Sequence, residues 1–145
     1  MIKSQMDEIK RVIINLNEFS EFIAAPDDDS EYNIEDHIHF YKIDRENIIY
    51  PFILIDYGDT TLSRISNNKI PFTSNSYFIL IEDIQESYNN YFEDFTDEVV
   101  NLINEFFINC HDLHLLSIDL VEGPVESKYK NNNVVSMIFK LDIGF

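Results

Sequence analysis

The sequence predicts an α+β fold, in which a mixed or antiparallel sheet of about four to five strands packs against two main helices. Apolar residues recur at helical spacing in two separate stretches, apolar runs typical of strands lie between these stretches, and two more strand patterns follow the second one. The predicted order is helix, three strands, helix, two strands. At 145 residues the chain has the length of one domain, so we expect residues 1–145 to form a single domain.

The first predicted helix lies near the N-terminus and carries one continuous apolar stripe. Its apolar residues follow one another at intervals of three and four, which places them on one face of a helix. Pro26 and the acidic residues after it end the pattern. The stripe consists of Met6, Ile9, Val12, Ile13, Leu16, Phe19 and Ile23.

Three strand patterns follow. Residues 50–55, YPFILI, are apolar on both faces, which indicates a central strand covered from two sides. Residues 56–60 include Gly58 and predict a turn, after which residues 61–66 begin a second strand. Residues 77–84, YFILIEDI, predict the third strand.

The second predicted helix begins near Asp94 or Thr96, either of which can serve as its N-cap. Asp97 and Glu98 suit the positive end of the helix dipole. The apolar stripe of this helix consists of Val99, Leu102, Ile103, Phe106, Phe107 and Cys110.

Two alternating segments follow the second helix. Residues 116–120 predict a half-buried strand, which Gly123 and Pro124 break. Residues 135–143 alternate most cleanly in the chain and predict the last strand.

We expect the sheet and both helices to share one core. The sheet residues expected in it are Phe52, Leu54, Ile79, Ile81, Ile118, Leu120, Met137, Phe139 and Leu141. The helix residues expected to pack on them are Ile9, Ile13, Leu16, Leu102, Ile103 and Phe106.

Acidic residues dominate the charge of the chain. It has 27 Asp and Glu against 10 Lys and Arg, which gives a formal net charge of −17. This balance argues against a protein that binds nucleic acid by itself or docks on an anionic membrane, because both need Lys and Arg. It permits a basic partner or a surface that repels DNA, while solubility alone is the simpler explanation.

Cysteine content and hydropathy bear on the cellular compartment. Cys110 is the single cysteine, so no internal disulfide is expected and no oxidising compartment is implied. The N-terminal residues lack the basic and apolar regions of a signal peptide, and no apolar stretch reaches about 18 residues. We therefore expect synthesis in the cytoplasm and no membrane partner.

Asp56 and Asp59 flank Tyr57 and Gly58 directly after the central apolar run. Two carboxylates three residues apart are candidate ligands for Mg²⁺. A catalytic magnesium site usually needs further carboxylates or a bound phosphate, and the sequence has no glycine-rich phosphate loop. We therefore interpret these aspartates as part of a polar turn at the end of a core strand.

The histidines and the cysteine are the other candidates for metal binding or catalysis. His37 and His39 fall in HIHFYKI, a candidate short strand in which both would face the same side, and His111 and His114 follow the second helix. A zinc site needs three or four such ligands in register, and neither pair supplies them. Cys110 lies on an apolar stripe, which predicts a buried, unreactive thiol. Because no G-x-S-x-G motif is present either, we expect no enzyme activity, metal or cofactor.

Two further clusters have simple interpretations. The acidic run at 27–29 resembles a fragment of a calcium loop but lacks the spacing of an EF-hand, so we interpret it as a solvated loop. Tyr88, Tyr91, Phe92 and Phe95 have helical spacing, which in so acidic a protein indicates core or subunit contacts rather than base stacking.

The order of these elements resembles the small tail terminator and tail-completion proteins of tailed bacteriophages. Such chains typically open with a helix, pass through a Tyr-Pro-apolar strand and end on a long strand. Here residues 50–55 supply YPFILI, and residues 134–145 supply VVSMIFKLDIGF. Length and acidity are also similar, whereas the long connection at residues 26–46 departs from the pattern.

The resemblance implies a structural protein of the virion that has no catalytic residues. Such proteins form a ring, often six-fold, that caps the tail tube, stops its polymerisation and offers its other face to neck or head–tail connector proteins. The implied partners are further copies of the chain, the tail tube protein and neck proteins, with assembly in the host cytoplasm. DNA would pass through without specific binding, since an acidic channel wall repels it.

Contacts within such a ring join two different patches of each subunit. We expect an acidic and apolar patch around residues 26–46 to meet Lys or Arg side chains from the strand-rich half. The candidate contact residues are Asp27, Asp28, Asp29, Asp56, Asp59, Arg64, Lys69, Lys128 and Lys130.

A second class of function is compatible with the same sequence. A small acidic α+β protein can act as an immunity or inhibitor protein that binds a basic toxin or nuclease, because opposite charge speeds association. A ring protein is expected to form oligomers and an inhibitor to remain a monomer, so the oligomeric state discriminates between them.

Overall fold

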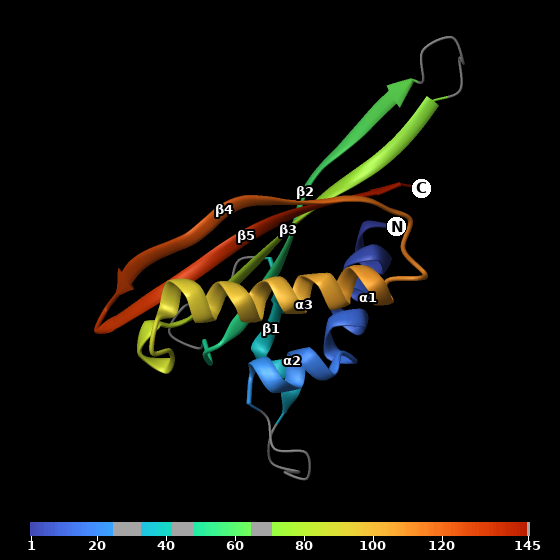
Figure 1. The fold of residues 1–145 in the computed structure, drawn as a ribbon. Coiled ribbons are helices and arrows are strands. Elements are labelled where there is room, and N and C mark those ends of the chain that lie inside the picture. The colour runs from blue at the N-terminus through green and yellow to red at the C-terminus, as the bar shows by residue number, and fades with distance from the viewer. Residues whose placement is uncertain (25–32, 42–47, 65–70, 145) are drawn as a thin grey trace.

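The computed structural model describes residues 1–24, 33–41, 48–64 and 71–144, and for residues 63, 64, 71 and 72 it describes the backbone alone. It confirms an α+β fold with a five-stranded mixed sheet (Figure 1). The helices are α1 (Ile2–Ile14), α2 (Asn17–Phe22) and α3 (Thr96–Asn109). The strands are β1 (Ile38–Phe40), β2 (Phe52–Arg64), β3 (Pro71–Ile84), β4 (Leu115–Tyr129) and β5 (Asn132–Gly144). Short helical segments are η1 (Ile34–His37), η3 (Gln85–Ser87) and η4 (Tyr91–Phe95).

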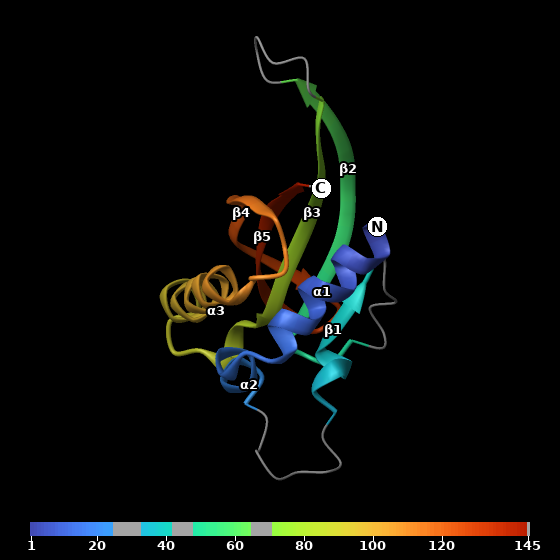
Figure 2. The ribbon, with the colours of Figure 1, turned by 90° about the vertical axis from the view of Figure 1, so that its right-hand side faces the viewer.

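The strands lie in the order β1-β2-β3-β5-β4, so β3 is the central strand. β1 pairs parallel to β2, and the other ladders are antiparallel. The β2–β3 ladder continues to the pair Arg64–Pro71, whereas β5 accompanies β3 only as far as the pair Ser74–Gly144. Residues 62–64 and 71–73 therefore form a two-stranded arm that projects beyond the sheet (Figures 1 and 2).

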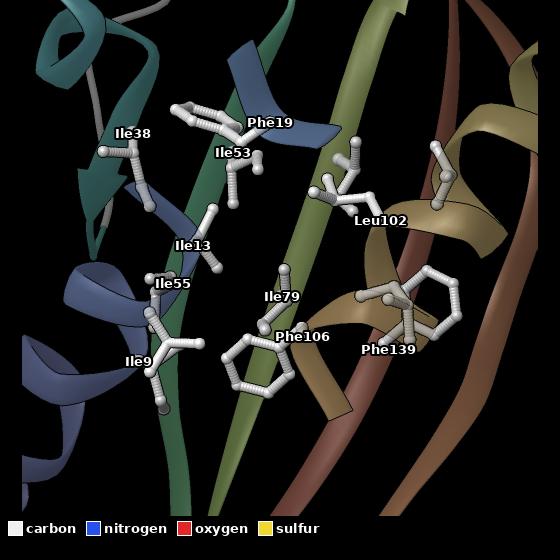
Figure 3. Packing of buried hydrophobic residues seen from close by; sticks show 14 of the residues in the cluster. Ile9, Ile13, Phe19, Ile38, Ile53, Ile55, Ile79, Leu102, Phe106 and Phe139 are labelled. Carbon is white, nitrogen blue, oxygen red and sulfur yellow. The ribbon is translucent and has the colours of Figure 1, made fainter. Parts of the chain in front are cut away.

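All three helices cover the same face of the sheet (Figure 2). Side chains of α1 and α3 meet side chains of β2, β3 and β5 in the core (Figure 3). The six helix residues predicted for the core are all buried, and so are six of the nine sheet residues. The sheet residues confirmed in the shared core are Ile79, Ile81, Met137, Phe139 and Leu141, whereas Phe52 is buried outside that cluster, beside His39 and Tyr50.

The prediction is wrong for Leu120 and too strong for Leu54 and Ile118. Leu120 is 53% exposed because β4 is an edge strand. Leu54 is half-buried because Ile53 and Ile55 point to the helices, which leaves Leu54 on the other face of the sheet. Ile118 is also half-buried, although it packs against the core.

The first predicted helix is divided in two. Leu16 has extended backbone angles of φ −78° and ψ 133°, and α2 begins after it in a new direction. The change of direction places Phe22 beside Phe95, with ring centroids 6.5 Å apart. The apolar stripe is therefore buried as predicted, but against α3 as well as the sheet.

The predicted turn at residues 56–60 is wrong. β2 runs through these residues as one strand, and its register with β3 shifts between Tyr57 and Thr60. Gly58 and Asp59 form a β-bulge, which adds residues to one strand without ending it. The two strands predicted around this point are therefore one, and β1 supplies the third strand before α3.

Two other boundary predictions are wrong as well. β4 continues through Gly123 and Pro124, with register shifts on both sides of Gly123, which has a φ of +118°. Neither Asp94 nor Thr96 caps α3, because η4 leads directly into the helix. Instead, Asn90 caps η4 by accepting a hydrogen bond from the backbone of Glu93.

Candidate assembly surfaces

The bulge in β2 is tied to the interior by a chain of hydrogen bonds. The Thr60 hydroxyl donates to Asn75 at 2.6 Å, and the Asn75 amide donates to the side-chain oxygen of Gln5 on α1 at 2.9 Å. The buried Tyr77 hydroxyl also donates to Gln5, and burial raises the pKa of Tyr77 to about 12. This network fixes α1 against β3 at the base of the arm.

Asp56 and Asp59 lie exposed along this part of β2. Within the described residues, no three His, Cys, Asp or Glu side chains are arranged to hold a metal ion. The two aspartates therefore add negative charge to an open surface below the arm.

The face of the sheet that α1, α2 and α3 leave uncovered, which we call the helix-free face, carries an apolar row across neighbouring strands. Leu54 pairs with Leu80, and Leu80 pairs with Ile138, so the three side chains lie side by side. Together with Phe78 and Val121 they line a hollow of about 360 Å³. The sequence prediction missed this surface because it assumed cover on both faces of the sheet.

α3 has a second apolar side, which faces outward. Phe107, predicted to be buried, is 61% exposed, and its neighbour Ile108 is 59% exposed. Phe92, in η4 just before α3, is exposed too, whereas Phe95 is fully buried. Of the predicted aromatic series, Phe95 belongs to the core and Phe92 to the surface.

A buried carboxylate lies where β3 ends. Asp83 accepts hydrogen bonds from the Tyr88 hydroxyl at 2.6 Å and from the backbone of Ile84 at 2.8 Å. Burial raises the pKa of Asp83, and burial together with the neighbouring Asp83 raises the pKa of Glu98. The sequence prediction assigned no role to this cluster, although an acidic residue at the end of the apolar run YFILIED was a signal for it.

The predicted contact residues that the structure describes do not gather in one place. Arg64 ends β2 in the arm, whereas Lys128 lies near the β4–β5 turn at the opposite end of the sheet. Lys130 lies in that turn with a φ of 54°, and its amino group is 5.7 Å from the ring centre of Tyr129. The side chain of Arg64, and all of Asp27, Asp28, Asp29 and Lys69, lie outside what the structure describes.

The histidines separate into different environments. His37 belongs to η1 rather than a strand; it is buried and donates a hydrogen bond from Nδ1 to the Pro51 carbonyl at 2.7 Å. His39 lies in β1 with its ring against Phe52, and burial lowers its pKa. His111 and His114 are exposed after α3.

Cys110 is buried at the end of α3, as the sequence predicts. Its thiol donates to the Phe107 carbonyl at 3.3 Å, and burial raises the thiol pKa. A raised pKa lowers the thiolate fraction, so the thiol is a weak nucleophile.

Comparisons with known protein families and curated sequences do not assign this chain to a family. No protein-family model matches this chain, and no curated protein sequence matches it. Among the described residues, no helix is both long and apolar enough to cross a membrane.

Proposed function

We propose that the protein is a virion structural protein, a ring-forming tail terminator or neck component of a tailed bacteriophage. In this role it caps the tail tube and joins it to the head–tail connector. The observation that carries the proposal is the two-stranded arm at residues 62–64 and 71–73, which extends beyond the neighbouring strand β5.

The arm is suited to contact another subunit. A two-stranded ribbon is only marginally stable by itself in water, and its backbone edges can pair with another chain. Leu62, on the described part of the arm, is 67% exposed, which a contact with a neighbouring subunit would reduce. Docking on a neighbour would therefore stabilise the arm and connect the subunits.

The helix-free sheet face is the receiving surface in this proposal. Its hollow, between Leu54, Leu80 and Ile138, provides apolar area that helices do not cover. An arm that meets a different patch on the next subunit makes a head-to-tail contact, and such contacts close into rings when the rotation allows it.

The charge of the chain is consistent with a DNA channel but works against assembly. A net charge of −17 per subunit repels both DNA and other subunits. Salt screens this repulsion over a distance that shortens from about 30 Å at 0.01 M to about 3 Å at 1 M. We therefore expect ring formation to increase with ionic strength.

Mass measurement in solution tests the proposal, using light scattering or native mass spectrometry across that salt range, with and without tail tubes. The matched variant replaces residues 62–73 by Asn-Gly, so that Thr61 and Ser74, which pair in the ladder, are joined by a two-residue hairpin turn. We expect the wild-type chain to form a closed oligomer and the shortened chain to remain a folded monomer.

Other results distinguish the alternatives. Oligomers that persist in the shortened chain contradict the role of the arm. A wild-type chain that stays monomeric at every salt concentration, and that binds neither tubes nor connector proteins, refutes the ring proposal. That outcome favours the acidic inhibitor of a basic toxin or nuclease instead.

A further inference from the structure

α3 is apolar on two sides. Its inner stripe, which includes Leu102 and Phe106, is buried against the sheet. Its outer side exposes Val100, Phe107 and Ile108 with exposed fractions of 42%, 61% and 59%. Their spacing of i, i+7 and i+8 places these three side chains on one face of the helix. The exposed residues beside them on α3 include Asn101, Asn104 and Asn109, so the apolar patch interrupts a polar surface and is a candidate interaction site.

Acidic residues dominate the part of the sequence that contains this patch. Between Lys69 and Lys128 the sequence contains twelve Asp and Glu residues and no Lys or Arg. The exposed acidic residue closest to the patch in helical position is Asp97, which lies three residues before Val100. On α1, Lys3 pairs with Asp7, and Arg11 pairs with Glu8 and also reaches Asp112, just after α3, at 3.5 Å.

An acidic hollow adjoins the patch at the start of α3. It has a volume of about 380 Å³, and Tyr88, Asp94, Asp97 and Glu98 are among the residues that line it. The hollow lies at the N-terminal end of α3, one turn before Val100, whereas Phe107 and Ile108 lie in the last turn, so a partner segment that runs along the helix contacts both. Apolar area and carboxylates are therefore presented together to a partner.

We propose that the outer face of α3 binds a basic amphipathic segment of a partner protein, in which apolar side chains are flanked by Lys and Arg. The apolar side chains cover Val100, Phe107 and Ile108, and a cationic side chain enters the hollow beside Asp97. A second copy of the chain is a poor occupant, because it would bring a net charge of −17 to an acidic face. This inference does not depend on the ring, since it uses neither the arm nor the helix-free sheet face.

The probe is a synthetic helical peptide with Leu at helical spacing and Lys at the other positions. Fluorescence anisotropy measures its binding to the full chain at physiological salt. We expect saturable binding that the double variant Phe107→Ser, Ile108→Ser weakens at least about tenfold, since both residues lie in the patch. Because both side chains are exposed, the variant should keep the wild-type circular dichroism spectrum and melting temperature.

Two controls test whether binding is specific to the patch and whether it needs apolar contact as well as charge. Leu120→Ser removes an equally exposed side chain from β4, and we expect it to leave the affinity unchanged. A peptide of the same charge with Ser in place of Leu should bind at least about tenfold more weakly than the Leu peptide, because it cannot cover the patch.

Three outcomes overturn the inference. The first is absence of binding to the Leu–Lys peptide. The second is equal binding of both peptides, which reduces the interaction to charge, or an equal loss of affinity with Leu120→Ser, which shows that binding is not specific to the patch. The third is a change of oligomeric mass in the Phe107→Ser, Ile108→Ser variant, which makes a second copy the occupant.

Discussion

Leu120 and Phe139 lie directly opposite each other in the β4–β5 ladder, yet Phe139 is 5% exposed and Leu120 is 53% exposed. Opposite residues in an antiparallel pair project from the same face of the sheet. The difference in exposure therefore arises from the position of each strand, since β5 lies inside the sheet and β4 forms its edge.

This pair gives the first prediction. Phe139→Ala should lower the free energy of unfolding by about 3–5 kcal/mol, because it leaves a cavity in the core. Leu120→Ala should change it by only about 0.5 kcal/mol, as is usual for a surface position. Chemical denaturation measures both values. Similar losses for the two variants would show that β4 is covered in solution.

The second prediction concerns the buried amide of Gln5. Its side-chain oxygen accepts from both Tyr77 and Asn75, so Gln5→Ala leaves these donors without their acceptor. We expect a loss of about 1–3 kcal/mol in unfolding free energy. In a Tyr77→Phe background one donor is already absent, so the same substitution should cost less. Additive losses in this double-mutant cycle would contradict direct coupling.

The third prediction concerns pH. The pKa values of Asp83 and Glu98 are raised in the folded chain, so folding favours their protonated forms. This stabilisation is fully present below their ordinary pKa values of 3.8 and 4.5 and is lost as pH rises through the raised values. Asp83→Asn should therefore be more stable than the wild-type chain near neutral pH, and the advantage should disappear in acid.

Urea denaturation across a pH series checks this expectation, with Asp59→Asn as the control because the Asp59 side chain is exposed. If the free energies of unfolding of Asp83→Asn and the wild-type chain differ by the same amount at every pH, titration of Asp83 does not contribute to the stability of the fold.

The fourth prediction compares two glycines. A Cβ atom at Gly123 would lie 2.7 Å from the Ser136 carbonyl oxygen and 2.8 Å from the Met137 Cα, and the φ of +118° disfavours any side chain. Gly123→Ala should therefore cost more than about 1 kcal/mol of unfolding free energy. Gly58→Ala should cost less, because its nearest contact is the outer edge of the Phe78 ring, which can move. Thermal unfolding ranks the two variants, and a reversed order would contradict the geometry at Gly123.

The spacing of apolar residues predicts the fold class and most of the core, because the buried positions of a helix or a strand recur at a fixed interval along the chain. It could not distinguish a β-bulge from a turn, since Gly58 and Gly123 supply backbone freedom that suits both. It also could not show that helices cover only one face of the sheet. For this reason Leu54 was predicted for the core.

The candidate surfaces were less predictable than the fold. Phe107 fits the apolar stripe of a helix, and only the packing of α3 shows that it faces outward. Arg64 and Lys128 were grouped because both are cations in the strand-rich half, whereas the ladder registers place them at opposite ends of the sheet. Such separations depend on strand order, which a single sequence does not specify.

The central position of β3 has a consequence for how the chain folds. The β2–β3 and β4–β5 ladders are hairpins between chain neighbours, whereas the β3–β5 ladder joins distant residues such as Ser74 and Gly144. Local hairpins close at a smaller entropic cost than distant pairings. During synthesis, the edge of β3 that will pair with β5 therefore has no strand beside it until β5 has emerged from the ribosome. For that interval, the apolar residues of β3 depend on α1 and α3, or on a chaperone, for protection from other nascent chains.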